Sequence, residues 1–108
     1  MTGANRGLGY GIVKALLQWD PMPKMVVLAC RSEDKGKKAC ADLEVEFPNA
    51  KGHLEYGVVD LIDQDSIDAF VLDIKTRFGK VDCLLNNAGI MFRHAFINMD
   101  TYDIVEKI

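Results

Sequence analysis

A glycine-rich stretch at the start of the chain constrains its fold more than any other feature. It runs Thr2-Gly3-Ala4-Asn5-Arg6-Gly7-Leu8-Gly9, and apolar residues at helical spacing follow between Tyr10 and Trp19. A diphosphate needs backbone N–H groups aimed at it, the positive end of a helix and no Cβ atoms in between, and glycines that enter a helix supply all three. We expect Gly3 to permit a tight turn, Gly7 the close approach of a ligand, and Gly9 the packing of the helix on a sheet. A flexible turn without a ligand is the alternative, because glycine triads are common.

The rest of the chain alternates short β-rich runs with helical segments, which is typical of βαβ units. Three apolar runs predict buried parallel strands, at residues 25–30, 54–59 and 81–86. Helices are expected at residues 33–47 and 65–78. The fold class predicted is therefore α/β, a Rossmann-type doubly wound parallel sheet with helices on its faces.

The ends of the two later helices carry the residues that usually begin and end helices. Asp63, Asp65 or Ser66 is a candidate cap for the start of the helix at 65–78, and Gly79 stands just beyond its end. Pro48 is expected to end the helix at 33–47. Helix boundaries are thus predicted from local chemistry as well as from periodicity.

Composition bounds the class of protein. A chain of 108 residues with 49% hydrophobic content suits one domain, here residues 1–108. The net charge of −3 arises from mixed signs, so no electrostatic footprint for nucleic acid or an anionic membrane is present. The longest apolar run, residues 25–30, is too short to span a bilayer, and we expect a cytoplasmic protein. Cys30, Cys40 and Cys83 are expected to be buried free thiols.

The glycine-rich stretch together with Asn86-Asn87-Ala88-Gly89 resembles the short-chain dehydrogenase/reductase family. The residues after each motif are most similar to the carbonyl reductase branch, with retinol-dehydrogenase-like enzymes as the alternative. The resemblance covers residues 2–108. It implies the N-terminal, cofactor-binding portion of an NADPH-dependent reductase, which transfers hydride between NADP(H) and a small carbonyl or alcohol substrate. A non-catalytic nucleotide-binding or regulatory truncation remains the competing hypothesis.

The resemblance also implies positions for the cofactor. Asp60 and Leu61 are expected to contact the adenine, while Asn87, Ala88 and Gly89 line the end of the strand beside the cofactor. All of these residues follow predicted strands, at the edge where open parallel sheets bind ligands. Asp60 could instead be an ordinary loop acid near the helix cap, and the amide of Asn87 could simply tie adjacent strands. The expected cofactor residues within the glycine-rich stretch are Gly3, Asn5, Arg6, Gly7, Leu8 and Gly9.

The end of the second predicted strand bears on which nicotinamide cofactor is bound. A carboxylate there favours a free ribose 2′-hydroxyl, whereas a 2′-phosphate is repelled by an acid and attracted by arginine. The chain has Arg31 at this point, and Arg6 offers a second cation, so NADP(H) is predicted. The alternative is that Arg31 pairs with Glu33 or Asp34 and that Arg6 faces solvent.

In the family, a central strand precedes the glycine-rich stretch, and here only Met1 stands before it. We therefore expect an incomplete sheet without its first strand. Residues 100–108 have the pattern of a helix that begins near the end of the chain. The family's catalytic Ser and Tyr-x-x-x-Lys are expected beyond residue 108, so no catalytic residue and no C-terminal half are assigned to this chain.

One sequence match to the catalytic pattern is rejected. Tyr10-Gly11-Ile12-Val13-Lys14 spells Tyr-x-x-x-Lys, but it lies on the helix that follows the glycines. A tyrosine there is expected to face the sheet or the phosphate side. His53 and His94 have no Ser, Cys or metal-ligand partner at a spacing typical of a catalytic or metal site, and both are expected at the surface. No metal site is predicted.

Overall fold

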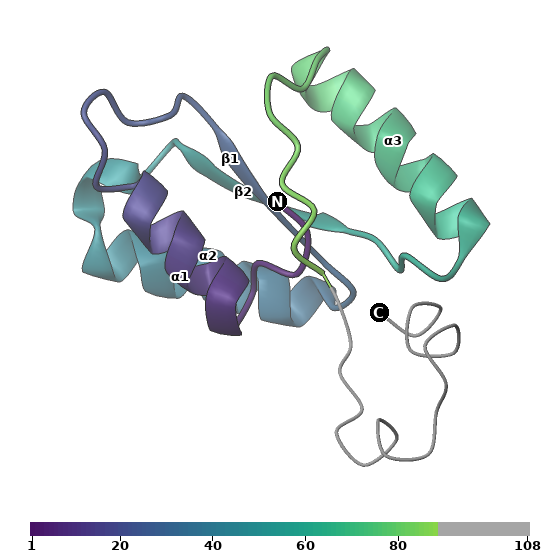
Figure 1. Ribbon diagram of the computed structural model, residues 1–108, viewed down its shortest axis with the longest axis horizontal. Coiled ribbons are helices and arrows are strands. Elements are labelled where there is room, and N and C mark those ends of the chain that lie inside the picture. The colour runs from purple at the N-terminus through teal and green to yellow at the C-terminus, as the bar shows by residue number, and fades with distance from the viewer. Residues whose placement is uncertain (89–108) are drawn as a thin grey trace, which may run out of the picture.

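The computed structural model describes residues 1–88, and Figure 1 shows the arrangement of its elements. Gly89, His94 and the helix predicted from residue 100 lie outside the described residues. The elements in chain order are helix α1 (Gly7–Leu16), strand β1 (Val26–Cys30), helix α2 (Glu33–Glu46), a short 3-10 helix (Pro48–Ala50), strand β2 (Leu54–Val58) and helix α3 (Gln64–Phe78). In residues 1–88, no helix is both long and apolar enough to cross a bilayer.

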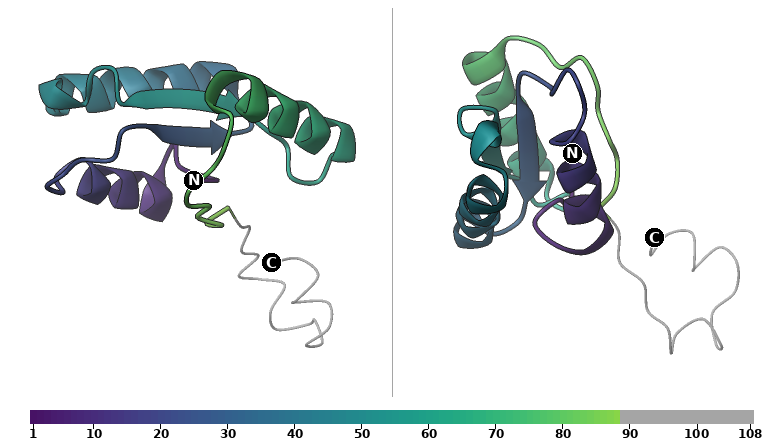
Figure 2. Two further views of the ribbon diagram at one scale, coloured as in Figure 1. Left: turned by 90° about the horizontal axis from the view of Figure 1, so that it is seen from above. Right: turned by 90° about the vertical axis from the view of Figure 1, so that its left-hand side faces the viewer.

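The sheet is parallel and small. Strand β1 pairs with β2 in a register that runs from Val26 opposite Leu54 to Cys30 opposite Val58. On the other side of β1, Thr2 forms an isolated parallel bridge with Ala29. Helices α1 and α2 lie side by side on one face of the sheet, and α3 lies on the opposite face (Figures 1 and 2). The described elements therefore have the layered α/β arrangement that the sequence predicts.

The core lies between the sheet and the two helices α1 and α2. Its fully buried large side chains are Val13 of α1, Leu28 of β1 and Leu43 of α2. The alternation of a strand points Leu28 to this face, and the stripe of α2 that carries Ala39 and Leu43 faces it. Burial of such side chains contributes about 1.5–3 kcal/mol each, so this layer is the main source of stability.

Helix α3 packs on the other face through fewer buried groups. Phe70 lies over Gly57, where an added Cβ would come 2.6 Å from Cε2 of the ring. Arg77 ties the helix to β2, because its guanidinium donates to the carbonyl oxygen of Tyr56 at 3.1 Å, while Asp73 of the same helix accepts from it at 2.7 Å. Ile74 is the only residue of α3 that is buried. This helix is thus held by buried Ile74, by Phe70 and by the bond from Arg77 to the main chain of β2.

The predicted helix ends are mostly confirmed. Asp63 caps α3, since its carboxylate accepts from the N–H groups of Asp65 and Ser66, and Gly79 follows the helix with φ 80°. Helix α2 ends at Glu46, next to Phe47 and Pro48. Helix α1 begins at Gly7, ahead of Tyr10, so the last two glycines of the stretch form its first turn.

The strand predicted at residues 81–86 is wrong: this segment is irregular in the structure. Its described contact with the sheet is one main-chain hydrogen bond, from Thr2 N to Leu85 O at 3.1 Å. A strand needs a paired neighbour along its length, and only Met1 to Gly3 lie between this segment and β1. The prediction that Cys83 is buried is wrong for the same reason, whereas Cys30 and Cys40 are buried as expected.

Candidate cofactor site

The glycines of the turn differ in what surrounds them. Gly3 and Gly7 have φ of 62° and 61°, a left-handed conformation that other residues adopt at a cost. A Cβ on Gly3 would lie 3.0 Å from Cα of Ala88, so that glycine also permits close packing. A Cβ on Gly7 would meet nothing within 4 Å, so the space beside this residue is open. A Cβ on Gly9 would come 2.5 Å from the carbonyl oxygen of Gly3, which explains the tight fit of α1 against the turn.

The first turn of α1 has no side-chain cap. Arg6 is the N-cap residue in an extended conformation, a guanidinium has no acceptor for the N–H groups of the helix, and the first turn holds no acidic residue. The N–H groups at this end are therefore without side-chain acceptors, and the helix dipole adds partial positive charge. Exposed Leu8 and Gly7 border this end of the helix. Such a donor set fits the diphosphate of a dinucleotide.

A network of hydrogen bonds fastens the turn to the segment that ends at Ala88. The buried hydroxyl of Thr2 accepts from the N–H groups of Asn87 and Ala88, each at 3.0 Å. The side-chain amide of Asn87 donates to the carbonyl oxygens of Thr2 at 3.1 Å and Gly3 at 3.2 Å. Asn87 therefore has the tying role considered from the sequence, while its contact with a cofactor stays a prediction. Thr2 was missed as a positioning residue, although it opens the motif.

Two cations stand near this end of the sheet. Arg31 directly follows β1 and Arg6 caps α1, and both are exposed. Within residues 1–88, neither guanidinium forms an ion pair or a hydrogen bond with another side chain. The alternative in which Arg31 pairs with Glu33 is not found, because the carboxylate of Glu33 accepts from the hydroxyl of Tyr56 at 3.1 Å and lies 3.4 Å from the ammonium of Lys37. Arg6 is exposed, as that alternative expects, and among residues 1–88 both guanidinium groups are without an anionic partner.

Asp60 follows β2 after Val59, whose N–H donates to the carbonyl oxygen of Cys30 at the end of β1 at 2.9 Å. Its carboxylate accepts from the N–H of Ile62 at 3.2 Å, and its own N–H donates to the hydroxyl of Ser66 at 2.8 Å. These bonds shape the turn into α3, in agreement with the structural alternative for Asp60. Leu61 is 46% exposed and therefore accessible. Contact of either residue with adenine stays a prediction.

Two of the cysteines, Cys30 and Cys40, are buried, and burial disfavours their thiolate forms. Cys30 donates to the carbonyl oxygen of Ser32 at 3.2 Å, and burial raises its pKa. Burial raises the pKa of Cys40 to about 11, with the carboxylates of Glu44 and Glu55 adding to the shift. Neither thiol has the depressed pKa of a nucleophile or metal ligand. Among the described residues, no group of three or more His, Cys, Asp or Glu side chains is placed to hold a metal ion.

The rejected Tyr-x-x-x-Lys match lies away from the open end of the turn. The ring of Tyr10 packs partly buried against the core between the sheet and the helices. Lys14 pairs with Glu46 of α2 at 3.0 Å, and its ammonium lies 5.8 Å from the centre of the Tyr10 ring. His53 has one ring nitrogen 2.9 Å from the carbonyl oxygen of Lys24. Tyr10 and Lys14 thus contact the core and α2, and His53 contacts the main chain of the loop before β1.

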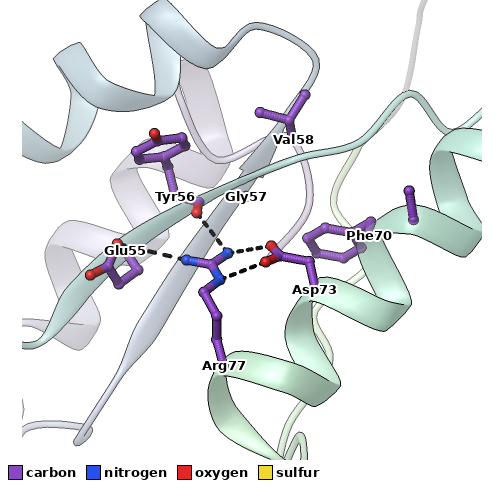
Figure 3. A pocket seen from close by; sticks show the side chains of 8 residues that line it. Glu55, Tyr56, Gly57, Val58, Phe70, Asp73 and Arg77 are labelled. Carbon is purple, nitrogen blue, oxygen red and sulfur yellow. Dashed lines mark hydrogen bonds and ion pairs between the residues drawn. The ribbon is translucent and has the colours of Figure 1, made fainter.

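A hollow of about 430 Å³ lies between β2 and α3 (Figure 3). Its most polar lining group is the guanidinium of Arg77, which is occupied by Asp73, by the Tyr56 carbonyl and by Glu55 at 3.7 Å. Phe70 and Gly57 form part of the remaining wall. The hollow contains none of the residues predicted to bind the cofactor, and its charges already satisfy one another.

Comparison with known proteins assigns this geometry to a family. The short chain dehydrogenase family model matches residues 1–108. A 3-keto-steroid reductase of Schizosaccharomyces pombe is 44% identical over 96 residues, which cover 82% of this chain and 28% of that protein. The carbonyl reductase 1 of Mus musculus, named for NADPH, is 35% identical over 101 residues, which cover 94% of this chain and 33% of that protein.

The fold is similar to solved structures as well. The NADPH-bound carbonyl reductase from chicken fatty liver has a TM-score of 0.74 with 29% identity, over 98% of this chain and 39% of that one. The chain thus spans 28% and 33% of the two curated relatives named above.

Proposed function

We propose, because the chain belongs to the short-chain dehydrogenase family, that it forms the NADP(H)-binding portion of an oxidoreductase. The whole protein would transfer hydride between NADP(H) and a small carbonyl or alcohol substrate, in the manner of a carbonyl reductase. The cofactor supplies the hydride chemistry, and the residues of this chain bind and orient it. No residue of the chain is assigned to proton transfer in this proposal.

The observation that carries the proposal is the open, uncapped N-terminus of α1 beside the carboxyl ends of the parallel strands. Its N–H groups and the open space at Gly7 fit the diphosphate, and the expected neighbours on the turn are Asn5, Arg6, Leu8 and Gly9. Asp60 and Leu61 are proposed to border the adenine. Asn87, Ala88 and Gly89 are proposed to border the nicotinamide half.

A preference for NADP(H) over NAD(H) is part of the proposal. Arg31 and Arg6 leave two guanidinium groups open to a 2′-phosphate, and the segment Cys30-Arg31-Ser32 holds no carboxylate. Arginine binds phosphate oxygens through paired, charge-assisted hydrogen bonds. The NADPH-bound carbonyl reductase of similar fold supports the same preference.

The test is a fluorescence titration of the chain with NADPH and, separately, with NADH. We expect NADPH to bind more tightly, and we expect Arg31→Ala to weaken NADPH binding about tenfold, as the loss of one charge-assisted contact with phosphate predicts. NADH binding should change little in this variant. Lys51→Ala, which removes an exposed charge after the short 3-10 helix, is the matched control.

Two results would contradict parts of the proposal. Equal affinity of the folded chain for NADPH and NADH would refute the cofactor preference, and no binding of either would refute the cofactor site. Turnover separates the remaining hypotheses: a whole protein that binds NADPH yet leaves aldehydes and ketones unreduced would be a non-catalytic nucleotide-binding protein.

A further inference from the structure

The availability of the Arg31 guanidinium depends on where the carboxylates that follow it in sequence are held. Glu33 is the first residue of α2, two positions beyond Arg31, and its side chain is 58% exposed. A carboxylate free to move at this point would neutralise the guanidinium and repel a 2′-phosphate. In the structure, Glu33 is instead engaged by the hydroxyl of Tyr56 and the ammonium of Lys37.

Tyr56 reaches Glu33 from β2, which is far away in sequence but adjacent in the fold. Its side chain is partly buried and packs against Gly36 of α2, where an added Cβ would lie 3.1 Å from the Cβ of Tyr56. Lys37 completes the arrangement, since its ammonium lies 5.9 Å from the centre of the Tyr56 ring. The ring is thereby held over the first turns of α2, which fixes the direction of its hydroxyl.

The electrostatics agree with this geometry. The hydrogen bond from Tyr56 and the proximity of Lys37 lower the pKa of Glu33, which favours its charged form. The hydrogen bond from Tyr56 also occupies one oxygen of this carboxylate, on the side of α2 that faces β2. Asp34, its neighbour in the first turn, forms no ion pair with Arg31 among the described residues.

We propose that Tyr56 is a positioning residue for cofactor selectivity: together with Lys37 it holds the Glu33 carboxylate away from Arg31, so that this guanidinium stays available to a 2′-phosphate. The inference rests on the proposed NADP(H) site. Tyr56 itself contacts no cofactor in this scheme, and its effect passes through Glu33.

The first test compares NADPH and NADH affinity in wild-type chain, Tyr56→Phe and the double variant Tyr56→Phe with Glu33→Gln. Loss of the hydroxyl should lower the ratio of NADPH to NADH affinity about threefold, the size expected for an exposed charge contact. The double variant should restore the ratio, because the carboxylate that competes is gone. Tyr10→Phe is the control, since Tyr10 packs against the same core.

The outcomes are distinct. An equal loss of affinity for both cofactors in Tyr56→Phe would indicate a merely structural role and overturn the inference, as would failure of Glu33→Gln to restore the ratio. If the wild type shows no preference for NADPH, the proposed function itself fails and this inference falls with it.

The second test does not involve a cofactor. Titration of the Glu33 carboxyl by carbon-13 NMR should give a higher pKa in Tyr56→Phe than in the wild type, since the largest cause of the lowered pKa is the bond from Tyr56. Identical pKa values in the two proteins would show that the contact is absent in solution, and the inference would be abandoned even if NADPH binds.

Discussion

The two faces of the sheet are built differently. On the face covered by α1 and α2, Leu28 and Leu43 are completely buried. On the face covered by α3, Ile74 is the one buried residue of the helix, and Leu72 remains 66% exposed. The first face is held by apolar packing, and the second by Phe70 and the bonds of Arg77.

Two apolar runs of the chain show a related contrast. An apolar run becomes a strand only where its main chain finds hydrogen-bonding partners. Residues 25–30 and 81–86 have similar sequence patterns, yet only the first contains a strand. Strand β1 pairs with β2 along its length, and on its other side it exchanges bonds with Met1 and Gly3 at 2.9 and 2.8 Å. The later run has a single main-chain bond, to Leu85, and Leu84 stays 62% exposed.

The largest expected effect comes from deleting a side chain on the well-packed face. Leu43→Ala should lower the free energy of unfolding by about 3 kcal/mol, because it leaves a cavity in a fully buried position. Leu72→Ala, the matched change on α3, should cost less than about 0.5 kcal/mol, since that side chain is mostly exposed. Urea denaturation measures both values. Equal losses would show that the two faces contribute alike.

The reactivity of the thiols compares the well-packed face with the segment after α3 and needs no mutation. Exposed Cys83 should react with an alkylating reagent at neutral pH about a hundredfold faster than buried Cys30 and Cys40, whose modification requires opening of the core. The pKa of Cys40, about 11 in the folded chain, further disfavours its thiolate. Mass spectrometry of timed samples gives the three rates. Comparable rates would mean that the first face opens as readily as the segment after α3.

The bonds of Thr2 join the glycine-rich turn to the segment that follows α3. Thr2→Val removes the acceptor of the Asn87 and Ala88 N–H groups and should cost about 2 kcal/mol, as expected when buried hydrogen bonds are lost. Hydrogen exchange of these two amides should accelerate. Thr2→Ser keeps the hydroxyl and should leave exchange slow. Unchanged exchange in the valine variant would show that the segment is not anchored by this residue.

The smallest effect is expected at the start of α3. Asp63→Ala should destabilise the chain by about 1 kcal/mol, because two N–H groups lose their cap. Asp63→Asn, whose side-chain oxygen can still accept, is the control, and circular dichroism during thermal unfolding provides the measurement. A loss as large as that of Leu43→Ala would indicate that α3 carries more of the stability than its packing suggests.

The local features of the fold were predictable, and the pairing of elements was only partly so. Periodicity with Asp63 and Gly79 gave the ends of α3, because caps act within a few residues. The strand at 81–86 was predicted wrongly, since its apolar pattern does not reveal whether a neighbour is present. One of the two interpretations of Asn87 was that its amide ties neighbouring segments together. The structure confirms this, because the amide donates to the carbonyl oxygen of Thr2.

The candidate site shows the same limit. The glycine-rich turn could be recognised from residues that are adjacent in sequence, and its left-handed glycines follow from local geometry. The partner of Glu33 could not be predicted, because Tyr56 lies on β2 and only the fold brings it next to α2. Sequence alone therefore left the pairing of Arg31 with Glu33 open.

Arg77 has a consequence for how molecules of this protein meet one another. Among residues 1–88, strand β2 has no neighbouring strand on the side away from β1. The carbonyl group of Tyr56 is one of the main-chain groups on that side. The guanidinium covers that oxygen (Figure 3). An unpaired strand edge invites the strands of other molecules, and a charged side chain on it opposes their approach. We therefore expect Arg77 to disfavour edge-to-edge pairing of chains at this strand, besides holding α3 to β2.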